Sequence, residues 1–150
     1  MPQRLRQWWA LSKGERAALP AMMLALPLLS ASLRMFGYAR TRRWVERATT
    51  CTTTRDATPA ERARGERLAL LAAIAGRHGP VRTTCLRQSL LVYGMLRRGG
   101  LKPELKIGAR QTSAVPDMHA WVELDAVPLG QGDLHHIPFP PSSGNRASSA

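Results

Sequence analysis

The chain has 150 residues, of which 44% are hydrophobic and 21% charged, so it is expected to form a globular domain rather than a disordered chain. Its formal net charge of +12 suits acidic peptides or anionic lipid, whereas the sequence lacks the zinc-finger spacing and the aromatic stacking patch that would favour nucleic acid. The two cysteines, Cys51 and Cys85, are too few for a disulfide framework, so a reducing compartment with Cys85 free is the simpler expectation.

Changes in composition along the chain divide it into three parts. Residues 1–48 are expected to form an N-terminal helical segment, and residues 49–137 a core of helices and strands. Residues 138–150 are rich in proline and serine, which predicts a flexible tail.

The first part holds a long apolar run. Ser12 and Glu15 have the spacing of a capping box, which predicts a helix that begins directly after Ser12. Ala17 to Leu33 are 17 consecutive residues without a formal charge, interrupted by two prolines. Such a run has the composition of a short membrane span, a secretory signal or a kinked, mostly buried helical pair that ends at Gly37. We favour the buried pair, and peripheral membrane contact stays open.

A second helix is expected after a threonine-rich connection. Thr58 and Glu61 form another capping box, with Pro59 at the first helical position, and the helix should run to about Gly76. Its apolar residues recur at helical spacing and should be buried: Leu68, Leu71, Ala72 and Ala75.

Cys85 lies where a third helix should begin. Thr83 and Thr84 are candidate N-caps, and Gly99 has the position of a C′ glycine. Behind the cysteine, an apolar stripe recurs at helical spacing: Leu86, Leu90 and Tyr93. A thiol in a first helical turn lies near unpaired N–H groups and the positive end of the helix dipole, which favours the nucleophilic thiolate. A lone cysteine is nevertheless more often a small packed residue.

The remaining chain predicts strands. Residues 104–109, 119–124 and 127–130 are expected to form a small antiparallel sheet, with a loop rather than a helix between the first two. Within 119–124 the residues alternate, so that His119, Trp121 and Glu123 share one face. The fold class is therefore α+β: N-terminal helices followed by a Cys-bearing helix packed on a small antiparallel sheet.

A cysteine at a helix start followed by a histidine at a strand start is the order found in transglutaminase-like and papain-like cysteine hydrolases. The sequence is more specifically similar to the lasso-peptide leader peptidases, over roughly residues 80 to 125. The resemblance rests on blocks that occur in the same order: Thr84-Cys85-Leu86, Gln88-Ser89-Leu90, Leu96-Arg97-Arg98-Gly99-Gly100-Leu101, Leu105-Lys106-Ile107-Gly108 and His119-Ala120-Trp121-Val122-Glu123.

The resemblance implies a cysteine peptidase that removes the leader from a ribosomally made lasso precursor peptide. Cys85 would be the nucleophile and His119 the general base, with N–H groups at the helix start stabilising an oxyanion. This chemistry needs no cofactor and no metal. Neighbouring residues on an extended chain point to opposite faces, so His135 and His136 are a poor metal site.

A third residue should orient the histidine, and relatives carry an acidic residue about a dozen positions after it. Glu123 lies roughly 13 Å along the strand from the histidine, and Asp125 is farther, so both are excluded. With a three-residue hairpin loop at 124–126, Gln131 would lie opposite the histidine and Asp133 diagonal to it on the same face. With a two-residue loop neither would face it. We expect Asp133, with Gln131 as the alternative.

The resemblance also implies partners. The first 80 residues lack the strand-rich pattern of a fused leader-binding domain, so the chain is expected to work with a small separate leader-binding protein. The released core peptide would pass to an ATP-dependent macrolactam synthetase. These partners predict a cytoplasmic protein, peripheral to the inner face of the membrane if the apolar run touches lipid.

Two other readings stay open. One is a transglutaminase or amidase type of acyltransferase with the same fold. The other is a non-catalytic basic adaptor, at a membrane or on nucleic acid, in which Cys85 is merely packed.

Overall fold

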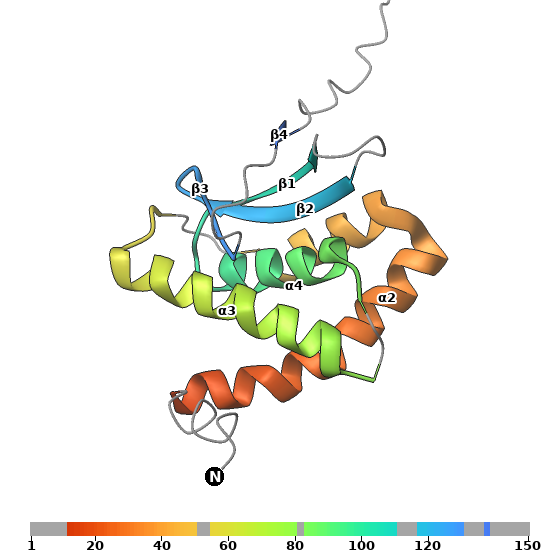
Figure 1. The fold of residues 1–150 in the computed structure, drawn as a ribbon, viewed down its shortest axis with the longest axis horizontal. Coiled ribbons are helices and arrows are strands. Elements are labelled where there is room, and N and C mark those ends of the chain that lie inside the picture. The colour runs from red at the N-terminus through yellow and green to blue at the C-terminus, as the bar shows by residue number, and fades with distance from the viewer. Residues whose placement is uncertain (1–11, 51–54, 81–82, 111–116, 131–136, 139–150) are drawn as a thin grey trace, which may run out of the picture.

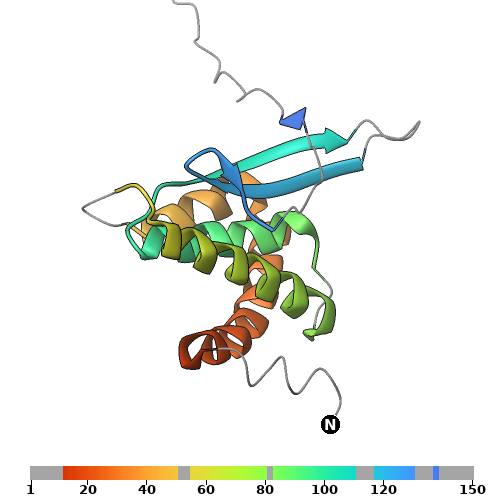
Figure 2. The same cartoon turned by 60° about the vertical axis from the view of Figure 1, so that its left-hand side comes forward.

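The structure is a computed structural model that describes residues 12–50, 55–80, 83–110, 117–130 and 137–138. The elements in chain order are α2 (Lys13–Ala48), α3 (Pro59–His78), α4 (Cys85–Arg98), β1 (Pro103–Arg110), β2 (Asp117–Leu124), β3 (Val127–Pro128) and β4 (Ile137–Pro138). The sheet lies over one side of the helices (Figure 1, Figure 2). The α+β class and the Cys-bearing helix against a small antiparallel sheet are confirmed.

Helix α4 is the central element of this arrangement. It packs against α2, α3, β1 and β2, so every layer of the fold touches it. Leu90 is completely buried and Tyr93 nearly so, and both join one hydrophobic core with Leu71 of α3 and Leu124 of β2. The predicted apolar stripe of α3 is buried as expected: Leu68, Leu71, Ala72 and Ala75.

The start of α2 is as predicted, but its end and its burial are not. The backbone N–H of Ser12 donates to Glu15 at 2.8 Å, and that of Glu15 donates to the Ser12 hydroxyl at 3.3 Å, which completes the capping box. Gly37 has φ of 76°, a left-handed conformation that glycine adopts without a Cβ clash. The chain therefore bends at Gly37 and continues helically to Ala48, instead of ending there.

The expectation of a mostly buried α2 is wrong. Met22 and Leu26 are 1% exposed, whereas Leu24 and Leu28 are 72% exposed and Met35 is 75% exposed. The core lies on one side of the helix only, so the apolar residues on the opposite side have no cover within the part of the chain that the structure describes. By length and composition alone α2 could cross a membrane, a test that buried core helices and signal sequences also pass.

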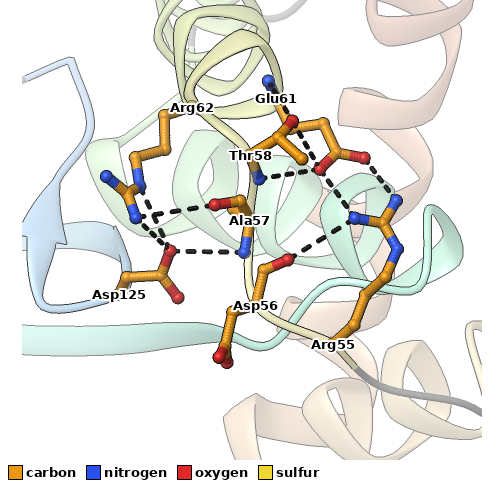
Figure 3. Close-up of polar contacts among 7 residues, drawn as sticks. All are labelled: Arg55, Asp56, Ala57, Thr58, Glu61, Arg62 and Asp125. Carbon is orange, nitrogen blue, oxygen red and sulfur yellow. Dashed lines mark hydrogen bonds and ion pairs between the residues drawn. The ribbon is translucent and has the colours of Figure 1, made fainter.

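The beginning of α3 is joined to the β2–β3 turn (Figure 3). Glu61 completes the capping box with Thr58 and pairs with Arg55 at 2.5 Å, and this hydrogen-bonded ion pair lowers the pKa of Glu61 to about 2. Arg62 pairs with Asp125 at 2.9 Å. The backbone N–H of Ala57 donates to the same carboxylate at 3.3 Å. The turn thus lies fixed against the first turn of α3.

The sheet has the strand order β3-β2-β1-β4, and its described pairings are antiparallel. The first two strands agree with the predicted ranges within two residues. The predicted third strand, 127–130, is shorter, because β3 ends at Pro128 and Gly130 turns away with φ of 68°. The register places His119 opposite Gly108.

Candidate functional site

Cys85 is the first residue of α4, as predicted, and its side chain is half-buried. Thr84 is the N-cap by its extended backbone, although its hydroxyl makes no capping hydrogen bond. The N–H groups of Arg87 and Gln88 donate to the Thr84 carbonyl at 3.1 and 3.2 Å. The helix itself offers no acceptor for the N–H groups of Cys85 and Leu86, because the first turn has no preceding carbonyls. The thiol therefore lies beside backbone donors that could stabilise a developing negative charge.

The turn before Cys85 is fixed by a side chain that sequence reasoning did not single out as a site residue. The Gln88 amide donates to the Thr83 carbonyl at 3.1 Å and to its hydroxyl at 3.3 Å. The Thr83 N–H in turn donates to the carbonyl of Gly76, near the end of α3, at 3.1 Å. A Cβ at Gly76 would lie 2.2 Å from the Gln88 amide nitrogen, so with any other residue at this position the Gln88 side chain would have to move. The start of α4 is thus held against the end of α3.

His119 lies in β2 and is half-buried. Its ring stacks on that of Trp121, with centroids 6.2 Å apart and planes inclined by 15°. Trp121 is 4% exposed and donates from Nε1 to Glu123 at 3.0 Å. The indole therefore forms a fixed wall beside the imidazole, and Glu123 is engaged with the indole.

A hydrogen bond joins the helix of Cys85 to the strand of His119. The Ser89 hydroxyl donates to the carbonyl of Ala120 at 2.9 Å. Ser89 lies four residues after Cys85 and so one turn along the same helix face, and Ala120 directly follows His119. No spacing in the sequence relates residues 89 and 120, so this link could not have been predicted from it. The bond fixes how the helix lies along the strand.

Cys85 and His119 line one cavity of about 160 Å³. Small residues also line this cavity: Ala69, Ala72 and Ala73 of α3, and Gly130. The structure thus brings the two residues that the sequence nominated to the same hollow. A thiol, an imidazole and the start of a helix around one hollow are the groups from which an acyl-transfer site can be built.

The geometry that favoured a third residue at 131 or 133 does not occur. Leu124 pairs with Val127, so the hairpin loop has two residues, Asp125 and Ala126, both with positive φ as in a type I′ turn. That turn follows the twist of the strands, and its residues are held by the contacts of Asp125 described above. The three-residue loop was therefore wrong. Asp133 and Gln131, like Cys51, His135 and His136, lie outside the described residues, and the third member stays a prediction.

A second hollow of about 250 Å³ adjoins the start of α4. Thr84 and Leu86, on either side of Cys85, contribute to its lining, and Arg34 of α2 and Arg87 of α4 make it cationic. Among the residues that the structure describes, no three His, Cys, Asp or Glu side chains come together as metal ligands.

Comparison with known proteins adds one finding. A family model described as the transglutaminase-like superfamily matches residues 25–140, a range that contains Cys85, His119 and the residues of the cavity between them. No curated protein and no solved structure matches the chain.

Proposed function

The chain belongs to the transglutaminase-like superfamily, and from this membership we propose that it is a cysteine peptidase that removes the leader from a lasso precursor peptide. The observation that carries the proposal is the shared cavity of Cys85, at a helix start, and His119, on the facing strand. The narrower assignment to leader removal rests on the matched blocks around these two residues.

In the proposed reaction, His119 takes the proton of the Cys85 thiol, and the thiolate sulfur attacks the carbonyl carbon of the scissile peptide bond. The N–H groups at the start of α4 stabilise the oxyanion of the tetrahedral intermediate. His119 then gives its proton to the departing amine, and a thioester remains on Cys85. A water molecule, deprotonated by His119, hydrolyses the thioester, which frees the carboxylate and restores the thiol.

The charge around the site supports an acidic substrate segment. Arg34 and Arg87 line the hollow beside Cys85, and the whole chain carries a net charge of +12. A leader peptide with carboxylates next to the cleavage site would gain from both arginines. Replacing these two arginines should therefore weaken the preference of the enzyme for leader peptides with an acidic segment.

The size of the cavity supports a separate leader-binding protein. About 160 Å³ is below the roughly 300–1,000 Å³ of typical ligand pockets, so the site holds little more than one side chain of a peptide. Recognition of a long leader then has to come from elsewhere, either from a small leader-binding partner or from the macrolactam synthetase that takes the product. Both partners would place the reaction in the cytoplasm.

The proposal is tested by alkylation and by cleavage. Iodoacetamide should label Cys85 faster than Cys51, and His119→Ala should slow the labelling of Cys85 without changing that of Cys51. Mass spectrometry of each cysteine separately makes Cys51 the internal control. Equal labelling of both cysteines, with no effect of His119→Ala, contradicts a catalytic thiol.

Cleavage of the precursor, with the leader-binding protein added, identifies the reaction. The peptidase yields leader and core whose summed mass exceeds the precursor by one water, and Cys85→Ala abolishes both products. An ammonia loss with a cross-link indicates a transglutaminase, and an ammonia-to-water exchange without cleavage indicates an amidase. Asp133→Asn should reduce cleavage more than Gln131→Ala if Asp133 is the third member. Full biological activity of the Cys85→Ala protein would contradict the peptidase and favour the non-catalytic basic adaptor.

A further inference from the structure

Helix α2 has two apolar faces on opposite sides, and only one of them packs on the core. Met22 and Leu26, four residues apart, share the buried face and are 1% exposed. Leu24, Leu28 and Met35 recur at intervals of four and seven residues on the other face and are 72–75% exposed. This second face is too apolar for a helix side that only meets water.

Beyond the bend at Gly37, the same helix carries cations beside aromatic rings. Arg40, Arg43 and Arg47 follow one another at helical spacing and are exposed. With Phe36 and Trp44 they line a hollow of about 340 Å³. The two rings contact each other, with centroids 5.1 Å apart. Guanidinium groups and aromatic edges thus lie side by side at the surface.

The apolar face and the arginine hollow form one continuous surface. A groove of about 600 Å³ runs between α2 and α4 and includes Leu28 and Met35. Phe36 and Trp44 line both this groove and the arginine hollow. We call the combined area the α2 surface and define it by these residues: Leu28, Met35, Phe36, Arg40, Arg43, Trp44 and Arg47.

We propose that the α2 surface docks on an anionic lipid bilayer, with its apolar side chains in the headgroup boundary and its arginines on lipid phosphates. Aromatic residues next to arginines on an exposed apolar helix are the composition of interfacial membrane helices. Among the described residues, no carboxylate lines either hollow, so the field there attracts anions. A second copy of the chain would bring the same positive charge to this face.

The helix lies on the membrane rather than across it. Met22 and Leu26 are part of the hydrophobic core, and Glu15 in the first turn forms an ion pair with Arg67 of α3. Crossing the bilayer would expose the core that these residues close and would break that pair. The docked protein therefore keeps its fold, and the cavity of Cys85 is not part of the α2 surface.

Binding to vesicles tests the proposal without any substrate. The full chain should float with vesicles of phosphatidylcholine and phosphatidylglycerol in equal parts, and much less with phosphatidylcholine alone. Replacing Arg40, Arg43 and Arg47 with Gln should weaken binding about a hundredfold, the change that corresponds to three surface charges at about 1 kcal/mol each. Raising the salt concentration should also weaken binding to the anionic vesicles, because salt screens the charges.

A matched variant separates a defined surface from general basicity. Arg64, Arg77 and Lys102 are exposed and lie outside the α2 surface, so replacing them with Gln removes the same net charge. This control should bind vesicles nearly as well as the unmodified chain. Equal losses in the two triple variants would overturn the proposal in favour of non-specific attraction.

The apolar side is tested by Leu28→Gln with Met35→Gln. Both side chains are mostly exposed, so the double variant should keep its circular dichroism and unfolding transition. It should nevertheless lose vesicle binding. The membrane proposal is wrong if the unmodified chain does not bind anionic vesicles. The α2 surface would then be a dimer interface if the double variant abolishes a dimer, or a peptide site if the surface binds only acidic peptide.

Discussion

The hydrogen bond from Ser89 to the Ala120 carbonyl should fix the helix of Cys85 on the strand of His119, and Ser89→Ala removes it. Ala120 is 4% exposed, so water cannot easily replace the lost donor. Losing the bond and leaving this acceptor under-satisfied should lower the free energy of unfolding by about 1–3 kcal/mol. For a chain of this size, each kcal/mol lowers Tm by about 2–4 °C. Urea unfolding should show a lower midpoint with an unchanged slope.

A positioning role predicts more than a loss of stability. Under native conditions, Ser89→Ala should slow alkylation of Cys85 by iodoacetamide, because the strand of His119 is then no longer held at a fixed place on the helix of Cys85. Ser89→Thr keeps the hydroxyl and should restore much of the rate. Cys51 again serves as the internal reference.

Ser30→Ala is the matched control. The Ser30 hydroxyl also donates to a backbone carbonyl, that of Leu26 at 2.7 Å, but both residues belong to one helix. Its removal should change stability little and leave the alkylation of Cys85 unchanged. A Ser89→Ala protein that unfolds at the same urea concentration as the unmodified chain, and whose Cys85 is labelled at the same rate, contradicts a positioning role of this hydrogen bond.

Two further predictions concern the ends of α3. The pKa of Glu61 is about 2 in the folded chain, below its ordinary 4.5, because Arg55 donates to it. The contribution of ionised Glu61 to stability is therefore complete above about pH 4.5 and is lost as the pH falls towards 2. The unmodified chain should have a higher Tm than Glu61→Gln, and this Tm difference should shrink across that pH range. A Tm difference that does not depend on pH contradicts the prediction. At the other end of α3, Gly76→Ala should displace the Gln88 amide and destabilise the fold by about 1–3 kcal/mol. It should also slow the alkylation of Cys85. If the variant is as stable as the unmodified chain and its Cys85 is labelled as fast, Gln88 moves freely and the prediction is wrong.

The sequence by itself determined the features that depend on neighbours along the chain. Both capping boxes were predicted because a cap needs only a hydroxyl and a carboxylate three residues apart. The start of α4 at Cys85 followed from apolar periodicity, and the strand of His119 from alternation. Cys85 and His119 were predicted to be catalytic partners because the sequence blocks around them occur in the same order as in the lasso-peptide leader peptidases.

Tertiary structure decided what depends on residues far apart in the sequence. Periodicity shows that α2 is apolar, but not which side the core covers, so the exposed face of Leu28 and Met35 appears only in the fold. The two-residue hairpin loop is held by contacts of Asp125 with the start of α3, and Arg62 lies 63 residues away from Asp125 in the sequence. The bond between Ser89 and Ala120 likewise joins two elements, and no local pattern encodes such a pairing.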